Sequence, residues 1–205
     1  MNKKKGLFIS FEGPEASGKS SQILLLQKYL TTKKISFITT REPGGTKLAE
    51  SLRNLILKIK SDINIDEEIL MLMAARSHHI NNVIKPAIDK GSLVISDRFA
   101  DSTFVYQGYV NKFGIQKAKS LHKNILNNFL PYKTFLFNLS SSKIIARLKK
   151  RKSKNKYDKL ERNFHDQVNR GYELISKNKR FIKIDASKSI TSINKKIINA
   201  INLLI

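Results

Sequence analysis

Residues 13–20 combine a lysine, two glycines and a hydroxyl at a spacing that suits phosphate binding. They fit the pattern G-x-x-x-x-G-K-[ST] and read Gly13-Pro14-Glu15-Ala16-Ser17-Gly18-Lys19-Ser20. The glycines let backbone N–H groups turn inward around an anion, and Lys19 adds a charge that reaches terminal phosphates. The Ser20 hydroxyl is a suitable oxygen ligand for Mg²⁺. The octet therefore predicts a phosphate-binding loop.

The residues on either side of this loop support the prediction. An apolar segment at 7–11 precedes it and is typical of a short strand. Apolar residues then recur at helical spacing from Ser20 to Leu30. A strand, a glycine-containing loop and a helix in this order point the helix N-terminus at a bound phosphate. The context favours a functional loop over a chance occurrence of the motif.

A second pair of chemically capable residues, Asp97 and Arg98, follows an apolar run at 93–96. A hydrophobic strand that ends in Asp resembles a Walker B element, whose carboxylate orients Mg²⁺ or its water. Arg98 has the charge and the shape to clamp a phosphate. The alternative is an ordinary surface ion pair, since many strands end in an acid. The presence of the glycine loop favours the functional interpretation.

A third candidate segment is residues 40–45, with the sequence Thr-Arg-Glu-Pro-Gly-Gly. Pro43 and the two glycines predict a tight loop in which the backbone can approach a ligand closely. Arg53 lies on the predicted helix that follows and has the length to reach the same pocket. An ordinary strand-to-helix turn is the alternative interpretation of this segment.

The segment from Arg147 to Lys156 is dense in basic residues and is followed by Asp158 and Glu161. Phosphoryl transfer needs cations around the transferred group, because charge spreads over its oxygens. Positions 14–17 of the loop contain no basic residue. A flexible cationic lid at 147–160 would supply what the loop lacks, and a solvated helix face is the alternative.

The composition is strongly basic, with 39 Lys and Arg against 16 Asp and Glu and a net charge of +23. The basic residues are spread along the chain, and the dense run has no interleaved aromatics, so nucleic-acid binding is not favoured. The chain contains no cysteine, which excludes disulfides and thiolate metal sites. The apolar run near the N-terminus is too short, and is broken too early by Glu12, for a signal peptide or a membrane span. We expect a cytoplasmic protein that does not associate with membranes.

Apolar, β-branched stretches alternate with helical patterns along the chain and predict an α/β fold. We expect a doubly wound, five-stranded parallel sheet with helices on both faces, in one domain spanning 1–205. Ligands of such sheets bind beyond the carboxyl ends of the strands, where the three candidate segments lie. The predicted strands are 8–11, 35–39, 93–96, 134–139 and 181–184. The predicted helices are 19–32, 46–59, 66–90, 115–129, 142–152, 160–177 and 190–203.

Taken together, these segments resemble the bacterial thymidylate kinases, a family of P-loop nucleoside monophosphate kinases. The resemblance extends from about residue 6 to residue 177 and rests on four segments. They are Phe11-Glu12-Gly13-Pro14-Glu15-x-Ser17-Gly18-Lys19-Ser20, Thr40-Arg41-Glu42-Pro43-Gly44-Gly45, Ala74-Ala75-Arg76 and Asp97-Arg98-Phe99-x-x-Ser102-Thr103-x-x-Tyr106-Gln107-Gly108.

The resemblance implies transfer of the γ-phosphoryl group of ATP to dTMP, with Mg²⁺ held by Ser20 and Asp97. It places the ATP phosphates on residues 13–20 and makes Lys19 and Arg98 catalytic. Its implied dTMP site contains Arg53 and Arg98 at the phosphate, Glu15 and Tyr106 at the sugar, and Leu72, Arg76, Ser102, Thr103 and Gln107 around the base. It also implies that Pro43 follows a cis peptide bond. A homodimer through the helix faces around 66–90 and 115–129 is typical of the family.

Two details place this chain within the family. The absence of a basic residue at 14–17, together with the basic run, resembles the lid-arginine type, with Arg151 as the first candidate for the catalytic cation. Lys150, Lys152 and Lys154 compete for that role. The family usually has Phe four residues before the base-reading arginine, where this chain has Leu72. We expect affinity for dTMP to be lower by about one stacking contact of ~1 kcal/mol.

Two other functions are compatible with parts of this pattern. One is a kinase of the same fold that acts on another nucleoside monophosphate, against which Arg76, Thr103 and Gln107 argue. The other is a basic, non-catalytic nucleic-acid-binding protein, which would bind DNA in a salt-sensitive way without turning over ATP. A panel of nucleotide acceptors distinguishes these possibilities.

Overall fold

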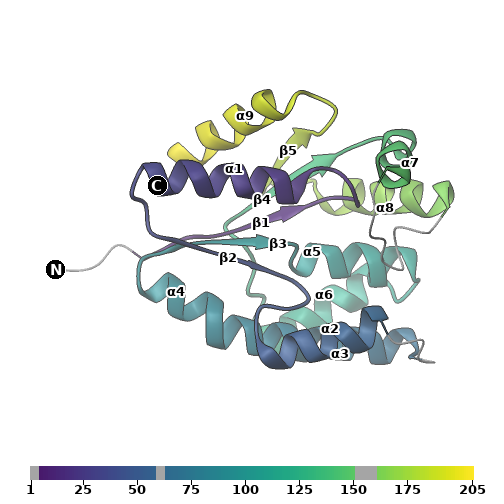
Figure 1. Cartoon of the computed structure of the whole chain (residues 1–205). Helices are drawn as coiled ribbons and strands as arrows, with labels where there is room; N and C mark the ends of the chain where they lie inside the picture. Colours follow the sequence, from purple (N-terminus) through teal and green to yellow (C-terminus); the bar gives the residue numbers. More distant parts are fainter. Residues whose placement is uncertain (1–4, 59–62, 151–160) are drawn as a thin grey trace.

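A computed structural model of the protein describes residues 5–58, 63–150 and 161–205. Five strands form one parallel sheet in the order β2-β3-β1-β4-β5 (Figure 1). The predicted α/β fold with a parallel sheet and helices on both faces is confirmed. The strands are β1 (Phe8–Glu12), β2 (Phe37–Arg41), β3 (Leu93–Asp97), β4 (Lys133–Asn138) and β5 (Phe181–Asp185).

The helices account for most of the remaining described residues, and none of those in the described ranges is long and apolar enough to cross a membrane. They are α1 (Lys19–Thr32), α2 (Lys47–Lys58), α3 (Ile65–His79), η1 (Ile80–Ile84), α4 (Lys85–Asp89), α5 (Ala100–Thr103), η2 (Phe104–Val110), α6 (Ile115–Leu126), α7 (Ser141–Lys149), α8 (Arg162–Ile175) and α9 (Ile190–Asn202).

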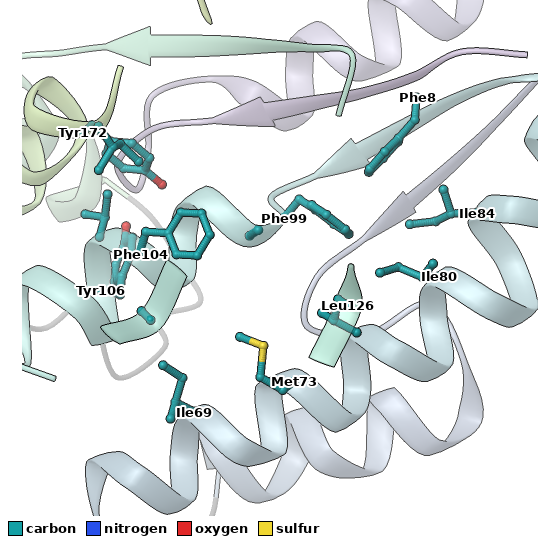
Figure 2. Close-up of a cluster of buried hydrophobic side chains, with 14 of the residues drawn as sticks. Phe8, Ile69, Met73, Ile80, Ile84, Phe99, Phe104, Tyr106, Leu126 and Tyr172 are labelled. Atoms are coloured by element: carbon teal, nitrogen blue, oxygen red, sulfur yellow. The ribbon is translucent and has the colours of Figure 1, made fainter. Parts of the chain in front are cut away.

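Successive strand residues point to opposite faces of the sheet and supply two separate hydrophobic clusters. Ile9 packs with α1 and α9 on one face, above the sheet in Figure 1. Phe8 packs with α3, α4 and α6 on the other face. Figure 2 shows this second cluster, with Ile69 and Met73 projecting into it from α3. Because both faces are covered, the central strand β1 is buried along its whole length.

The parallel register brings the carboxyl ends of the neighbouring strands β2, β3 and β1 together. Phe11 of β1 and Arg41 of β2 both pair with Asp97 of β3. The segments that follow β1, β2 and β3 therefore start at one edge of the sheet, as expected for a ligand site in this fold.

The predicted helix at 66–90 is interrupted in the structure. Residues Ile80–Ile84 form a π-helix, in which the Lys85 N–H donates to the Ile80 carbonyl, between α3 and α4. Pro86 lacks an N–H, and its ring crowds the carbonyl four residues before it, so the backbone widens at this point. The helical pattern was interpreted correctly, but this break was not predicted.

Residues 100–110 form α5 and η2, although the sequence pattern did not predict a helix there. This stretch contains Ser102, Thr103, Val105 and Gly108, which are poor helix formers. Packing of Phe104 and Val105 into the second cluster stabilises the helix despite this composition. The predicted start of β2 at residue 35 was also wrong, since residues 35 and 36 precede the strand.

Candidate active site

A cleft of about 540 Å³ opens at the carboxyl edge of the sheet. It brings together every predicted site residue that the structure describes, except Gly13 and Pro14 of the phosphate-binding loop, which do not line it. The lining includes Glu15, Ala16, Ser17, Gly18, Lys19, Ser20, Arg53, Leu72, Arg76, Asp97, Arg98, Ser102, Thr103, Tyr106 and Gln107. Arg41, Glu42, Phe99 and other side chains complete its walls.

The predicted phosphate-binding loop joins β1 to α1. Gly13 has a φ of 133°, and a Cβ there would collide with the Phe137 carbonyl, so only glycine fits. The Lys19 Nζ donates to the Gly13 carbonyl over 3.0 Å and to the Pro14 carbonyl over 2.8 Å. Burial lowers the pKa of Lys19 to about 8, and the nearby Arg98 acts in the same direction. A phosphate anion in the loop would favour the protonated amine and raise this pKa again.

Ser20 and Asp97 meet across the start of the cleft. The Ser20 hydroxyl donates to Asp97 Oδ2 over 2.9 Å, so the two oxygens lie within the reach of one small cation. Hydroxyl and carboxylate oxygens are ligands that Mg²⁺ accepts, and the remaining positions are usually filled by water and phosphate. Within the described ranges, no group of three or more His, Cys, Asp or Glu side chains could hold a metal ion.

Arg98 is the central cation of the cleft. Its backbone has a φ of 70°, and its guanidinium donates to Glu15 over 2.8 Å. The Tyr106 hydroxyl donates to the same carboxylate over 2.7 Å. Burial raises the pKa of Glu15, but Arg98, Lys19 and the Tyr106 hydrogen bond outweigh it and hold that pKa below its usual range. An anionic Glu15 thus holds Arg98 and Tyr106 together.

Glu12, at the end of β1, fixes the segment that carries Arg98. Its carboxylate accepts from the Phe99 backbone N–H over 2.7 Å, from Ser102 over 2.6 Å and from Tyr172 of α8 over 2.9 Å. Burial raises the pKa of Glu12 to about 7, assisted by the negative charge of Asp101. Buried hydrogen bonds of this kind keep the turn after β3 in one conformation.

The loop after β2 forms the opposite wall. The Glu42–Pro43 peptide bond is cis, as the family resemblance implied. The Arg53 guanidinium reaches back from α2 and donates to the Pro43 carbonyl over 2.7 Å. Arg53 and Arg98 therefore line the same cleft from different elements, which is the arrangement that a bound phosphate requires.

Arg76 of α3 is held by a buried network. Its Nε donates to Glu42 over 2.6 Å, and its Nη2 donates to Thr103 over 2.8 Å. The His79 Nδ1 lies 2.9 Å from the other oxygen of Glu42. Burial raises the pKa of Glu42, but Arg76 and His79 outweigh that effect and lower it. The guanidinium is thus placed in one orientation at the cleft wall.

Several residues of the site were not identified as functional from the sequence. These residues hold other side chains of the cleft in place through hydrogen bonds, and they are Glu12, Glu42, Glu68, His79 and Tyr172. Glu42 and Glu12 lie inside recognised motifs, and Glu68 lies two helical turns before Arg76. The position of Tyr172 on a distant helix has no local signal.

The basic segment is only partly described by the structure. Arg147 of α7 donates to the Ala16 carbonyl over 3.1 Å and to the Ala186 carbonyl over 3.0 Å, so it contacts the phosphate-binding loop directly. Arg151, the first candidate for the lid cation, lies outside the described residues, as do Lys152 and Lys154. Lys150 ends α7 as its C-cap residue.

A family model and several curated proteins that resemble this chain are all described as thymidylate kinases. The family model described as thymidylate kinase matches residues 11–197. A thymidylate kinase of Mycoplasma capricolum is 40% identical over 200 residues, covering 95% of this chain and 94% of that protein. One of Ruthia magnifica is 40% identical over 192 residues, covering 91% and 93%. One of Halothermothrix orenii is 37% identical over 196 residues, covering 94% and 95%.

Proposed function

This chain belongs to the thymidylate kinase family, and we propose that the cleft is its active site. It phosphorylates dTMP to dTDP with ATP. One observation carries the assignment of the site: the Glu15–Arg98 ion pair joins the ATP-binding loop to the predicted dTMP site. Two phosphate-bearing substrates held on either side of this pair would meet in the same cleft.

The loop at 13–20 binds the phosphates of ATP. Backbone N–H groups near the start of α1 face the anion, and the helix dipole favours negative charge there. Lys19 lies in the loop and presents its ammonium at the terminal phosphates, where negative charge accumulates during transfer. The acceptor is already a phosphate anion, so no strong general base is needed.

Ser20 and Asp97 hold Mg²⁺ when nucleotide is bound. A bound Mg²⁺ would neutralise phosphate oxygens and bring the leaving group into line. The Ser20–Asp97 hydrogen bond keeps both oxygens oriented toward the loop before the ion arrives. Asp97 also lies next to Arg98, so one turn supplies a ligand for the cation and a donor for the acceptor phosphate.

Arg53 and Arg98 bind the phosphate of dTMP from two sides. Each guanidinium is planar and presents several N–H donors, which suits the oxygens of a phosphate. Glu15 and Tyr106 lie beside Arg98, where the sugar would follow the phosphate. The carboxylate accepts from the 3′-hydroxyl, and the Tyr106 ring leaves little room for a 2′-hydroxyl.

The base of dTMP packs on Leu72 and is bound by Arg76, Thr103 and Gln107. These four residues lie on the same stretch of the cleft wall, from α3, α5 and η2. Ser102 supports this wall through Arg98 and Glu12. Arg76 can donate to a carbonyl but cannot accept from an amine, which favours thymine over cytosine.

The lid supplies the last cation. The loop residues Ala16 and Ser17 carry no positive charge, so a basic side chain from 147–160 completes the neutralisation of the transferred group. We assign this role to Arg151, which makes the enzyme the lid-arginine type. The contact of Arg147 with the Ala16 carbonyl supports an approach of the lid to the loop.

The active enzyme is a homodimer, of one domain per chain, that acts in the cytoplasm, where both nucleotides are available. Leu70 of α3 and Ile125 of α6 are 53% and 46% exposed on two helices that contact each other, within the helix faces where we expect the dimer contact. A second copy of the chain would cover them. Light scattering during size-exclusion chromatography gives the mass directly, and a monomer would reject this assembly.

The proposed site is tested with an acceptor panel of dTMP, dUMP, dCMP, AMP and GMP in an ATP-turnover assay. We expect phosphorylation of dTMP to exceed that of every other acceptor and to require Mg²⁺. A preference for another monophosphate would reject the assignment of the base site. Salt-sensitive binding of mixed-sequence DNA without ATP turnover would instead support a nucleic-acid-binding function.

A further inference from the structure

Two rows of side chains lie next to each other at one wall of the cleft. Glu68, Leu72 and Arg76 are four residues apart on α3, so they lie on one face of that helix. Thr103 and Gln107 are likewise four residues apart on the helical segment formed by α5 and η2. The rows come from segments about 30 residues apart in the sequence, and they meet only in the folded chain.

Two hydrogen bonds connect these rows. Arg76 donates to Thr103 over 2.8 Å at one end, and the Gln107 Nε2 donates to Glu68 Oε1 over 2.6 Å at the other. Leu72 lies between the two connections and lines the cleft. The base-binding wall is therefore an apolar residue with a fixed polar group on each side.

The Glu68 contact decides how the Gln107 amide is oriented. A carboxylate accepts hydrogen bonds and donates none, so the amide nitrogen must face Glu68 and the amide oxygen must point the other way. Gln107 lines the cleft, whereas Glu68 is 8% exposed and stands behind the lining. Glu68 thus determines which end of the amide is presented at the wall.

Arg76 is oriented in the same manner by Glu42, which accepts a hydrogen bond from its Nε over 2.6 Å. The wall consequently presents a fixed donor from Arg76 and a fixed acceptor from Gln107. Thymine has a carbonyl oxygen beside a ring N–H on its Watson–Crick edge, which complements this pair. Cytosine has an amine beside an unprotonated ring nitrogen, which opposes it at both positions.

We infer that Glu68 is a positioning residue that makes the enzyme selective for thymine over cytosine, by holding the amide oxygen of Gln107 toward the base. The inference rests on the proposed base site. Glu68 does not touch the substrate and acts only through Gln107. A carboxylate is required at this position because a neutral amide could accept from Gln107 in one orientation and donate to it in the other.

The test is Glu68→Gln, with kcat/KM measured for dTMP and for dCMP. The substitution keeps the size of the side chain but allows the Gln107 amide to turn over. We expect the dTMP:dCMP ratio of kcat/KM to fall about tenfold, the effect of one misdirected hydrogen bond. Glu67→Gln is the matched control, because it removes the same charge from the neighbouring residue, which lies in the exposed cap of α3. It should keep the wild-type ratio.

The results of this test distinguish an error in the proposed base site from an error in the role of Glu68. A wild-type enzyme without a preference for dTMP would reject the base site itself. A selective wild type and an unchanged ratio in Glu68→Gln would overturn the role of Glu68 alone, as would an equal loss for both substrates. If Glu68→Gln does not fold, Glu68→Asp is measured instead, because it keeps the charge but moves the carboxylate away from Gln107. A fall in its dTMP:dCMP ratio of kcat/KM would support the inference, and an unchanged ratio would overturn it. Failure of both variants to fold would assign Glu68 to stability and overturn the inference.

Discussion

The guanidinium of Arg98 and the carboxylate of Glu15 form a buried ion pair across 2.8 Å. Glu15 belongs to the loop after β1, and Arg98 belongs to the turn after β3. The pair connects the predicted phosphate-binding loop to the segment that we propose binds the acceptor phosphate. Because the Glu15 and Arg98 side chains are only 7% and 19% exposed, salt screens their interaction less than that of a surface pair.

We predict that Arg98→Lys lowers kcat about 100-fold without unfolding the protein. A lysine presents one compact charge and cannot contact Glu15, Ser102 and a phosphate at once. Steady-state kinetics with dTMP would measure the loss. Arg162→Lys, at an exposed ion pair with Asp166, is the matched control and should behave as wild type. A similar kcat in both variants would show that Arg98 has no role in transfer.

We predict that Lys19→Ala abolishes dTMP phosphorylation, with a loss of at least about 1,000-fold in kcat, while the fold is retained. Lys19 is the cation placed within the loop, where its ammonium donates to the Gly13 and Pro14 carbonyls and to the Ser17 hydroxyl. A coupled ADP-release assay measures turnover, and circular dichroism checks the fold. Near-wild-type turnover would contradict the assignment of residues 13–20 as the ATP site.

We predict that Arg76→Ala raises the KM for dTMP more than the KM for ATP. The variant loses a charge-assisted hydrogen bond to the base, worth roughly 1.5–3 kcal/mol. It also leaves Glu42 without its main counter-ion, so the fold should be checked by thermal unfolding. Initial rates with each substrate varied in turn give both constants. Equal increases in the two constants would place Arg76 in the scaffold instead.

We predict that Leu72→Phe tightens dTMP binding or leaves it unchanged, and does not abolish activity. A ring at this position would stack on the base and add on the order of 1 kcal/mol. Met73 packs into the core cluster (Figure 2). Tyr106 lines the cleft together with Leu72. Overpacking against Met71 or Tyr106 is the opposing effect.

Titration calorimetry of dTMP against both proteins measures the effect of Leu72→Phe. A loss of affinity beyond about tenfold, with the fold intact, would show that residue 72 does not face the base or that the pocket has adapted to Leu. In that case the base site would have to be reassigned, while the assignment of the phosphate-binding loop would stand.

We predict that Glu12 makes the protein less stable as the pH rises from about 4.5 to about 7. The folded state keeps the proton on Glu12 above the pH at which the unfolded chain releases it, so deprotonation favours unfolding in that range. This stability is fully present below the unfolded pKa of 4.5 and is lost as the pH passes through the folded pKa of about 7.

Glu12→Gln should lack this part of the pH dependence, because its side chain does not titrate. Urea unfolding of both proteins near pH 5 and near pH 8 gives the comparison. The stability of wild type relative to the variant should be higher near pH 5. An equal difference at the two pH values would contradict a raised pKa for Glu12.

Local signals in the sequence predicted much of the fold. Apolar runs predicted all five strands, and the helical spacing of apolar residues from Ser20 to Leu30 predicted α1. The helix at 100–110 was not predicted, because its residues favour a helix only when Phe104 and Val105 are buried. The π-helix before Pro86 was missed because its pattern of apolar residues does not differ from that of an α-helix.

The residue types at 13–20, 40–45 and 97–107 were sufficient to identify the kind of site and the candidates within it, because short motifs place functional groups through local backbone geometry. The tertiary structure alone decided which atoms meet. Glu15 and Arg98 are 83 positions apart, and Gln107 and Glu68 are 39 apart. Contacts over such separations depend on the strand order and on how the helices pack against the sheet, so no local pattern encodes them.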